Sequence, residues 1–267
     1  MMNYYDQHVH TYFSFDSEEV FENYLKNEPD FFVSTDHFDL KNPYSNFRDD
    51  IPDYQAYLKK LKELTQVVPK TEFLKGIEIG VVPGQEAMIK EYLSQRPYDV
   101  KIMSIHQNGR FDYMDDAVLA KGKYIVAKEY FQQMSTVLDS FFEGDILAHF
   151  DYGLRRFDFT VKELQENYED LLIEIFKKVI DLEMAVELNA KSFLKYNNAE
   201  LYAYAMPLYV SLGGKEFTLG SDAHVAADYQ NGFHEMSLLL KNIGIDKLTV
   251  FQGKERFVTE LPTITMS

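Results

Sequence analysis

Short apolar runs recur along the chain, and polar segments or segments with helical spacing separate them. Runs of about four to eight residues that are apolar throughout, or that alternate between apolar and polar, are typical of β-strands. On this pattern we predict strands at residues 4–10, 31–35, 72–79, 100–105, 145–149, 184–188 and 217–220.

The segments between these strands carry apolar residues three or four positions apart, which is the spacing of an amphipathic helix. We predict helices at residues 17–27, 53–68, 84–95, 127–142, 160–182, 198–214 and 233–245. The fifth has the clearest apolar stripe, formed by Leu164, Tyr168, Leu171, Leu172, Ile175 and Val179. Pro207 predicts a kink or a break in the sixth, because proline removes a helical hydrogen bond.

Strands that alternate with helices in this way indicate an α/β fold with a parallel sheet. In a chain of 267 residues we expect a closed or nearly closed barrel. An open doubly wound sheet would carry a glycine-rich phosphate loop after its first strand, and this sequence has none. There is no linker or repeat, so we expect a single domain over residues 1–267.

Composition narrows the range of functions. The formal net charge of −16 disfavours binding to nucleic acid or to an anionic membrane. The absence of cysteine excludes disulfides, thiolate metal ligands and cysteine nucleophiles. No signal peptide or long apolar segment is visible, so we expect a cytoplasmic protein that acts on neither membranes nor nucleic acids.

Side chains of the kind that bind metals stand at the ends of the predicted strands. Six of the seven histidines lie there. Because the carboxyl ends of barrel strands meet on the face that carries active sites, we expect these side chains to gather there. The candidate ligands are His8, His10, Asp16, His37, Glu78, His106, His149, Asp222 and His224.

Taken singly, these residues have ordinary explanations. A buried histidine is often a hydrogen-bonded core residue, and Asp36 or Asp222 after a strand is often a helix cap. The set as a whole favours metal binding, and its imidazoles and carboxylates suit Zn, Mn or Fe. The number of candidates predicts two or three ions, and Glu78 could bridge two ions about 3.5–4 Å apart. Such a centre suits the hydrolysis of phosphoesters or amides.

In this order, the motifs H-x-H-T…D, D-H, a lone Glu, S-x-H, A-H-x-D and G-S-D-A-H resemble the PHP (polymerase and histidinol phosphatase) family. The resemblance covers nearly the whole chain. The stretches "HFDYGLRRFD", "ELNAKSFLKYNN" and "FTLGSDAHVAADYQNGF" resemble the histidinol-phosphate phosphatase branch in particular.

This resemblance implies a distorted (β/α)7 barrel with a trinuclear centre at the carboxyl ends of the strands. It places one ion on His8, His10, Glu78 and Asp222, a second on Glu78, His106 and His149, and a third on Asp16, His37 and His224. The implied reaction is hydrolysis of L-histidinol phosphate, in histidine biosynthesis, by a hydroxide that bridges the metals. Asp222 or His224 would move a proton to the leaving oxygen.

The residues that contact the substrate are less clearly marked. An arginine is expected on the phosphate, since its fork matches two phosphate oxygens. We place Arg156 slightly ahead of Arg155, and Lys191, Asn189 and Ser192 could also reach the site. Arg110 is a further possibility, although it reads equally well as a turn residue. The cationic half of the substrate could meet acidic loop residues, which are Asp112, Asp115 and Asp116.

Other functions remain open at this stage. A PHP hydrolase of a different small phosphoester, monoester or diester, would have the same metal ligands. A nuclease is disfavoured by the charge and by the lack of a basic stripe. A non-catalytic barrel would have lost ligands, and an amidohydrolase would more typically bridge its ions with a carbamylated lysine than with Glu78.

Overall fold

The computed structural model describes residues 3–141 and 143–262, and its main element is an eight-stranded sheet. Along the sheet the order is β3 (Arg48–Asp50), β2 (His37–Asn42), β4 (Glu72–Gly80), β5 (Val100–Ser104), β6 (Ile146–Leu147), β7 (Ala185–Asn189) and β8 (Phe217–Gly220). The strands from β4 to β8 follow chain order and run parallel, and only β3 is antiparallel to its neighbour.

Strand β1 (Phe31–Ser34) pairs with the first half of β4, and β2 pairs with its second half. The two strands therefore pair with the same edge of β4, one after the other. The regular strand structure is interrupted between them at Thr35 and Asp36. Since His37 lies opposite Glu78 in this register, the interruption sets a histidine beside the central glutamate of β4.

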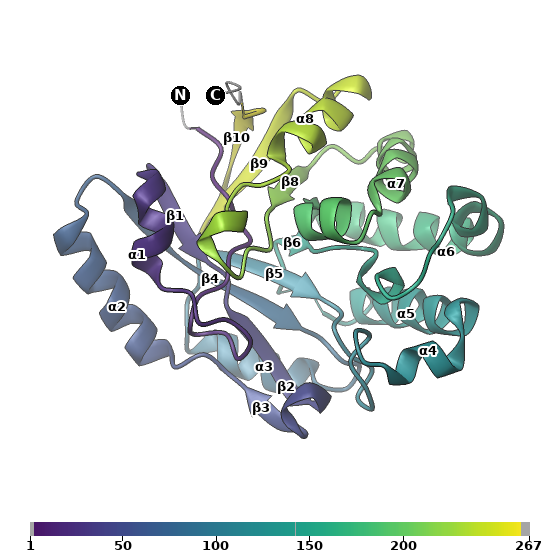
Figure 1. Ribbon diagram of the computed structural model, residues 1–267, viewed down its shortest axis with the longest axis horizontal. Helices are drawn as coiled ribbons and strands as arrows, with labels where there is room; N and C mark the ends of the chain where they lie inside the picture. The colour runs from purple at the N-terminus through teal and green to yellow at the C-terminus, as the bar shows by residue number, and fades with distance from the viewer. Residues whose placement is uncertain (1–2, 142, 263–267) are drawn as a thin grey trace.

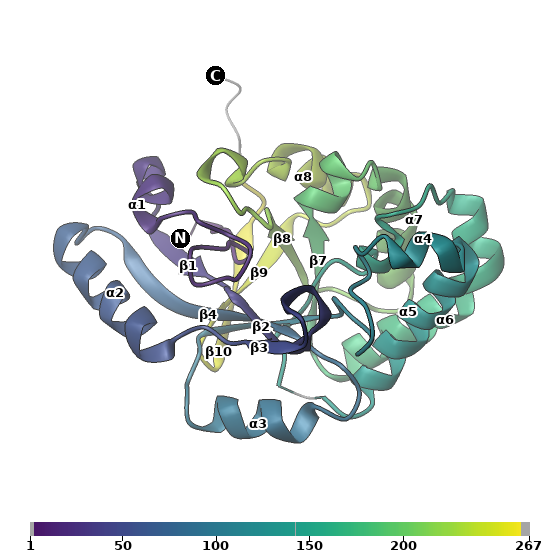
Figure 2. The same cartoon turned by 60° about the horizontal axis from the view of Figure 1, so that its bottom comes forward.

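Helices surround the sheet in both views (Figures 1 and 2). They are α1 (Phe21–Tyr24), α2 (Tyr54–Val67), α3 (Glu86–Ser94), α4 (Ala117–Lys121), α5 (Lys123–Leu138), α6 (Val161–Asp181), α7 (Ala199–Ser211) and α8 (Phe233–Asn242). Short 3-10 turns stand at η1 (Leu25–Asn27), η2 (Pro43–Ser45), η3 (Tyr152–Leu154) and η5 (Ala226–Asp228), and a π-helical turn at η4 (Lys191–Lys195). None of the helices in the described ranges is long and apolar enough to cross a membrane.

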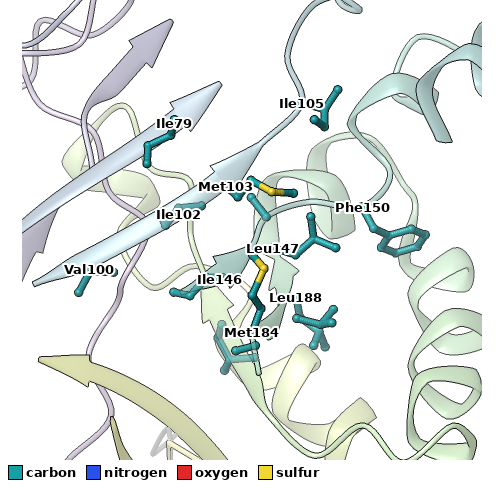
Figure 3. Close-up of a cluster of buried hydrophobic side chains, with 14 of the residues drawn as sticks. Ile79, Val100, Ile102, Met103, Ile105, Ile146, Leu147, Phe150, Met184 and Leu188 are labelled. Carbon is teal, nitrogen blue, oxygen red and sulfur yellow. The ribbon is translucent and has the colours of Figure 1, made fainter. Parts of the chain in front are cut away.

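Helix α6 illustrates how the sequence fixes these elements. It begins with a capping box between Thr160 and Glu163, which satisfies free backbone N–H groups of its first turn. Its buried side is the predicted stripe, with Phe176 added and Leu171 only partly buried. Met103 and Leu147, which pair across β5 and β6, belong to the buried apolar cluster of Figure 3, and so does Ile102 on the opposite face of β5.

The structure corrects the sequence prediction in several places. Helix α1 begins at Phe21, four residues after the predicted start at Ser17. Helix α7 continues through Pro207 without a break, because its buried face, which includes Tyr202 and Met206, holds it against the core. The β2–β3 pair and the C-terminal hairpin of β9 (Lys247–Gln252) and β10 (Glu255–Glu260) were not predicted.

The predicted first strand, residues 4–10, forms only an isolated bridge between Val9 and Ala223. Hydrogen bonds from side chains replace the backbone pairing of a regular strand there. The Tyr4 hydroxyl donates to the Leu219 carbonyl and accepts from the Leu219 N–H, and the Asp6 carboxylate accepts from the Ser221 N–H. Backbone groups of β8 are thus satisfied without a regular strand opposite them.

Residues 8–10 nevertheless hydrogen-bond to both sides. His10 N donates to Ala223 O at 2.8 Å, Asp222 N to His8 O at 2.9 Å, and Thr35 N to Val9 O at 2.7 Å. The segment therefore lies between the ends of β8 and β1. The parallel α/β sheet is confirmed, whereas closure into a complete barrel stays a prediction, as does the single domain over residues 1–267.

Gly220, the last residue of β8, has no room for a side chain. A Cβ there would lie 2.0 Å from Glu187 Oε1 and 2.7 Å from the His8 Cβ. We expect Gly220→Ala to lose about 1–3 kcal/mol of stability in urea unfolding, the usual cost of overpacking a core. Gly84→Ala is the comparison for backbone strain without a collision, since φ there is +93° and an added Cβ meets no atom within 4 Å. A Gly220→Ala protein as stable as the wild type would contradict this account.

Candidate metal centre and pocket

Glu78, in the middle of β4, is a buried carboxylate surrounded by histidines. Its Oε1 lies 3.0 Å from His149 Nε2, 3.1 Å from His106 Nε2 and 3.3 Å from His8 Nε2. Its Oε2 lies 3.1 Å from His37 Nδ1 and 3.4 Å from His10 Nε2. Five imidazoles from four different segments of the chain, with His8 and His10 on the same one, therefore converge on one carboxylate.

Asp222 and His224 follow β8 and meet the same cluster. Asp222 Oδ1 lies 3.5 Å from His10 Nε2 and 4.0 Å from His8 Nε2. The backbone of Asp222 is held at φ 54°, a left-handed conformation that costs energy in a residue other than glycine. A strained aspartate at this position is typical of a functional site.

Asp16 completes the outer side of the cluster. Its two oxygens lie 3.6 Å from His37 Nε2 and 3.1 Å from His224 Nε2. The His10 ring centroid is 4.3 Å from that of His37 and 4.1 Å from that of His224. All nine predicted ligands thus lie in one contiguous group.

Sets of ligand atoms within 4.8 Å of one another define the possible ion positions. The sets are His8, His10 and Asp222; His8, Glu78 and His149; His10, His37 and His224; and His37, Asp39 and His106. The first three overlap the three sets implied by the PHP resemblance. The fourth brings in Asp39, which the sequence analysis did not consider.

The donor atoms fit divalent transition metals. His8 Nε2, His10 Nε2, His37 Nδ1 and Glu78 Oε2 are buried and have no hydrogen-bond partner among the described residues. Buried polar atoms are rarely left unpaired, because each costs free energy. An ion bound by imidazole and carboxylate would satisfy them, and this donor chemistry suits Zn, Mn or Fe.

The charges of the cluster are strongly coupled. Burial alone would raise the pKa of Glu78, but the surrounding histidines, His8 first, hold it well below its usual range. Burial would lower the pKa of His37, but Asp16 and Glu78 raise it to about 9. Burial and the nearby His224 and His37 hold the pKa of His10 well below its usual range. Metal binding would release protons from such a cluster.

Residues behind the ligands orient them, and sequence reasoning missed most of these. Glu187 on β7 accepts from His8 Nδ1 at 2.6 Å, and Asp39 on β2 lies 3.1 Å from His106 Nδ1. Ser14 links His10 Nδ1 to Asp36, so Asp36 supports a candidate ligand here. Glu187 could have been found as a carboxylate inside an otherwise apolar strand. Asp39 could have been found two positions from His37 on the same face.

A pocket of about 230 Å³ opens over this cluster. Seven of the nine candidate ligands line it, and so do Arg155, Lys191 and Lys195. Arg155 is buried, and its guanidinium donates to Ser192 Oγ at 2.8 Å and to Asn189 Oδ1 at 2.9 Å. Lys191 Nζ lies 3.2 Å from Asp222 Oδ1. Asn189 therefore supports Arg155 from behind, while Arg155 and Lys191 face the pocket.

The other predicted substrate contacts lie elsewhere. Arg156, ranked first by the sequence analysis, donates to the Met114 carbonyl and pairs with Asp116 at 2.7 Å, and it does not line the pocket. Arg110 is exposed. The two neighbouring arginines thus have different partners, with Arg155 in the pocket and Arg156 on the loop that carries Met114 and Asp116. Of the predicted acidic residues, only Asp112 lines the pocket.

Comparison with known proteins identifies the family of this chain. The model of the family described as PHP domain matches residues 6–191, and the chain belongs to this family. The histidinol-phosphatase of Lactococcus lactis subsp. lactis (strain IL1403) is 28% identical over 256 residues, which are 93% of this chain and 94% of the relative. A probable histidinol-phosphatase of Clostridium acetobutylicum is 29% identical over 229 residues, 82% of this chain and 86% of the relative.

Solved structures extend the comparison. The crystal structure of histidinol phosphate phosphatase from Lactococcus lactis, complexed with zinc, L-histidinol and phosphate, superposes with a TM-score of 0.84 at 25% identity. The match covers 94% of this chain and 98% of that one. A crystal structure from Listeria monocytogenes, described as that of a putative histidinol phosphatase, shares the fold, with a TM-score of 0.72 at 16% identity.

If Glu78 is the shared ligand of the centre, removing its charge should release metal. We expect Glu78→Gln to lower zinc affinity more than about 100-fold, because the loss of a residue that only orients a ligand already lowers metal affinity about 10–100-fold. Elemental analysis after dialysis against a graded zinc buffer measures this. Glu91→Gln, on the exposed side of α3, is the control and should retain wild-type zinc. Equal zinc in both variants would exclude Glu78 as a ligand.

Asp112 gives a pH test. Burial raises its pKa to about 6, although the Met114 N–H and the Tyr152 hydroxyl donate to it. When a carboxyl has a higher pKa in the folded protein than in the unfolded one, its protonation stabilises the folded state. This stabilisation is complete below the pKa of the unfolded form, which is about 3.9 for aspartate. That contribution is lost as the pH rises through about 6.

In metal-free protein, Asp112→Asn should therefore be the more stable form at pH 7.5, by at most about 3 kcal/mol. The advantage should disappear near pH 4. Paired thermal melts at the two pH values measure it, and a difference that does not change with pH would contradict the assignment.

Proposed function

We propose that this PHP-family chain is a metal-dependent phosphomonoesterase that hydrolyses L-histidinol phosphate to L-histidinol and phosphate. The observation that carries the proposal is the single pocket in which the ligand cluster meets Arg155 and Lys191. The relatives named histidinol-phosphatase support the choice of substrate, as does the neighbour that holds zinc, L-histidinol and phosphate together. The small pocket volume suits a small ester better than a polymer.

The nine predicted residues would hold two or three ions of Zn, Mn or Fe, in the sets implied by the family. Bound ions would activate water as the nucleophile and neutralise charge on the phosphoryl oxygens. The protein's own side chains would provide the other contacts to the substrate. Arg155 presents N–H groups on a guanidinium held by Ser192 and Asn189, so it is preorganised for phosphate.

Asp222 and His224 are the proposed groups for proton transfer to the leaving oxygen, and their surroundings differ. Burial would raise the pKa of Asp222, but Lys191, His10 and Arg155 hold it well below its usual range. A carboxylate kept ionised in this way is a poor proton donor. His224 Nδ1 lies 3.1 Å from Lys191 Nζ, and its Nε2 faces Asp16.

An imidazole nitrogen that binds an ion has no proton to give. His224 Nε2 therefore serves either the outer metal position or proton transfer, but not both at once. In a centre with two ions, where the outer position is empty, His224 is free for proton transfer, and we assign the proton to His224 over Asp222 in that form.

The direct test is phosphate release by metal-loaded protein from L-histidinol phosphate and from a panel of other monoesters and diesters. We expect metal-dependent turnover, with L-histidinol phosphate strongly preferred. Bound metal without turnover of this ester, together with hydrolysis of another, would contradict the substrate and favour the second candidate, a PHP hydrolase of a different small phosphoester.

Arg155 should be required for phosphate binding. We expect Arg155→Ala to lower kcat/KM for phosphomonoesters about 10–100-fold, the value of one or two hydrogen bonds to a charged group. Arg155→Lys should recover only part of this, since lysine lacks the fork. Arg110→Ala, an exposed arginine near the pocket loop, is the control and should keep wild-type kinetics. An Arg155→Ala enzyme with unchanged kinetics would remove Arg155 from the site.

A further inference from the structure

The pocket contains one carboxylate that the proposed reaction does not use. Asp112 is only 7% exposed and lines the cavity. Its Oδ1 accepts from the Met114 N–H at 2.7 Å and from the Tyr152 hydroxyl at 3.2 Å. Its Oδ2 has no hydrogen-bond partner in the described part of the chain, and no lysine or arginine there forms an ion pair with Asp112. A buried charge without a cationic partner is costly.

The loop that carries Asp112 is firmly held. A bridge joins Gln107 to Asp112, and the Asp112 N–H donates to Asp115 Oδ2 at 3.0 Å. Two side chains that follow β6 hold the same loop from the other side, since Tyr152 contacts Asp112 and Arg156 donates to the Met114 carbonyl. Arg156 thus positions this loop, whereas Arg155 faces the pocket.

A cationic and an anionic side chain lie on either side of Tyr152 in this pocket. The Arg155 guanidinium lies 4.8 Å from the centre of the Tyr152 ring, and the hydroxyl of the same ring donates to Asp112. One aromatic ring therefore separates the cation suited to phosphate from a carboxylate that has no lysine or arginine partner among the described residues. A ligand with a phosphate at one end and a positively charged nitrogen at the other matches this order.

We propose that Asp112 binds the cationic end of the substrate and so selects phosphomonoesters that carry a positively charged nitrogen over neutral ones. The proposal rests on the proposed phosphatase function, because it assigns a specificity residue to that same pocket. A turn-forming role alone would need only an oxygen that accepts from the Met114 N–H. An asparagine keeps that oxygen, so Asp112→Asn separates the two roles.

The experiment compares matched esters on metal-loaded enzyme, namely 3-aminopropyl phosphate against propyl phosphate, with L-histidinol phosphate alongside. The wild type should prefer the cationic ester. Asp112→Asn should lower kcat/KM for both cationic substrates roughly 10–100-fold, mainly through KM, as expected for one charged hydrogen bond. Propyl phosphate should change less than about 3-fold, since that ester lacks the charge that Asp112 would bind. Asp170→Asn, on the exposed side of α6, makes the same charge change away from the pocket and should alter neither ester.

The outcomes separate this proposal from the function on which it rests. An equal loss on cationic and neutral esters, or a wild type without preference, overturns the role of Asp112. Turnover of L-histidinol phosphate that Asp112→Asn leaves unchanged overturns it as well, and leaves the proposed function standing. Failure to hydrolyse L-histidinol phosphate, with a cationic preference that Asp112→Asn abolishes, overturns the proposed substrate alone. Hydrolysis of none of these esters overturns both.

Discussion

The buried carboxylate of Glu78 is the constraint on which the rest of the structure depends. A glutamate in the middle of a central parallel strand would be strongly destabilising if it were left without partners. Here five histidines from four segments surround it, and each histidine reaches one of its two oxygens. The arrangement concentrates more nitrogen and oxygen donors than hydrogen bonding can satisfy. Divalent cations are the natural partners of such a set.

The backbone is adapted to this requirement. The interruption between β1 and β2 sets His37 opposite Glu78. Residues 4–10 are anchored by Tyr4 and Asp6, so that His8 and His10 face inward. Gly80 and Gly220 end their strands where a side chain would collide with Asp39 or Glu187. Those two carboxylates in turn orient His106 and His8. Local departures from regular strand geometry thus occur where ligands must be oriented.

Much of this could be predicted from the sequence. Ligand-type residues after successive strands predicted one cluster, because parallel strands end on one face, and all nine candidates lie there. Periodicity located most strands and helices, but not the N-terminal segment, where Tyr4 and Asp6 side chains replace strand pairing. It also could not decide between Arg155 and Arg156. The two arginines are adjacent and follow the same turn, so the surrounding sequence does not distinguish them. Only tertiary packing decides which one faces the pocket.

The most direct test of the central claim is anomalous diffraction at the zinc edge from crystals of the wild-type protein grown with zinc. The account predicts at least two anomalous peaks, each within coordination distance of the cluster, with Glu78 as a ligand shared by two of them. Zinc bound elsewhere, or a single ion that does not touch Glu78, would contradict it.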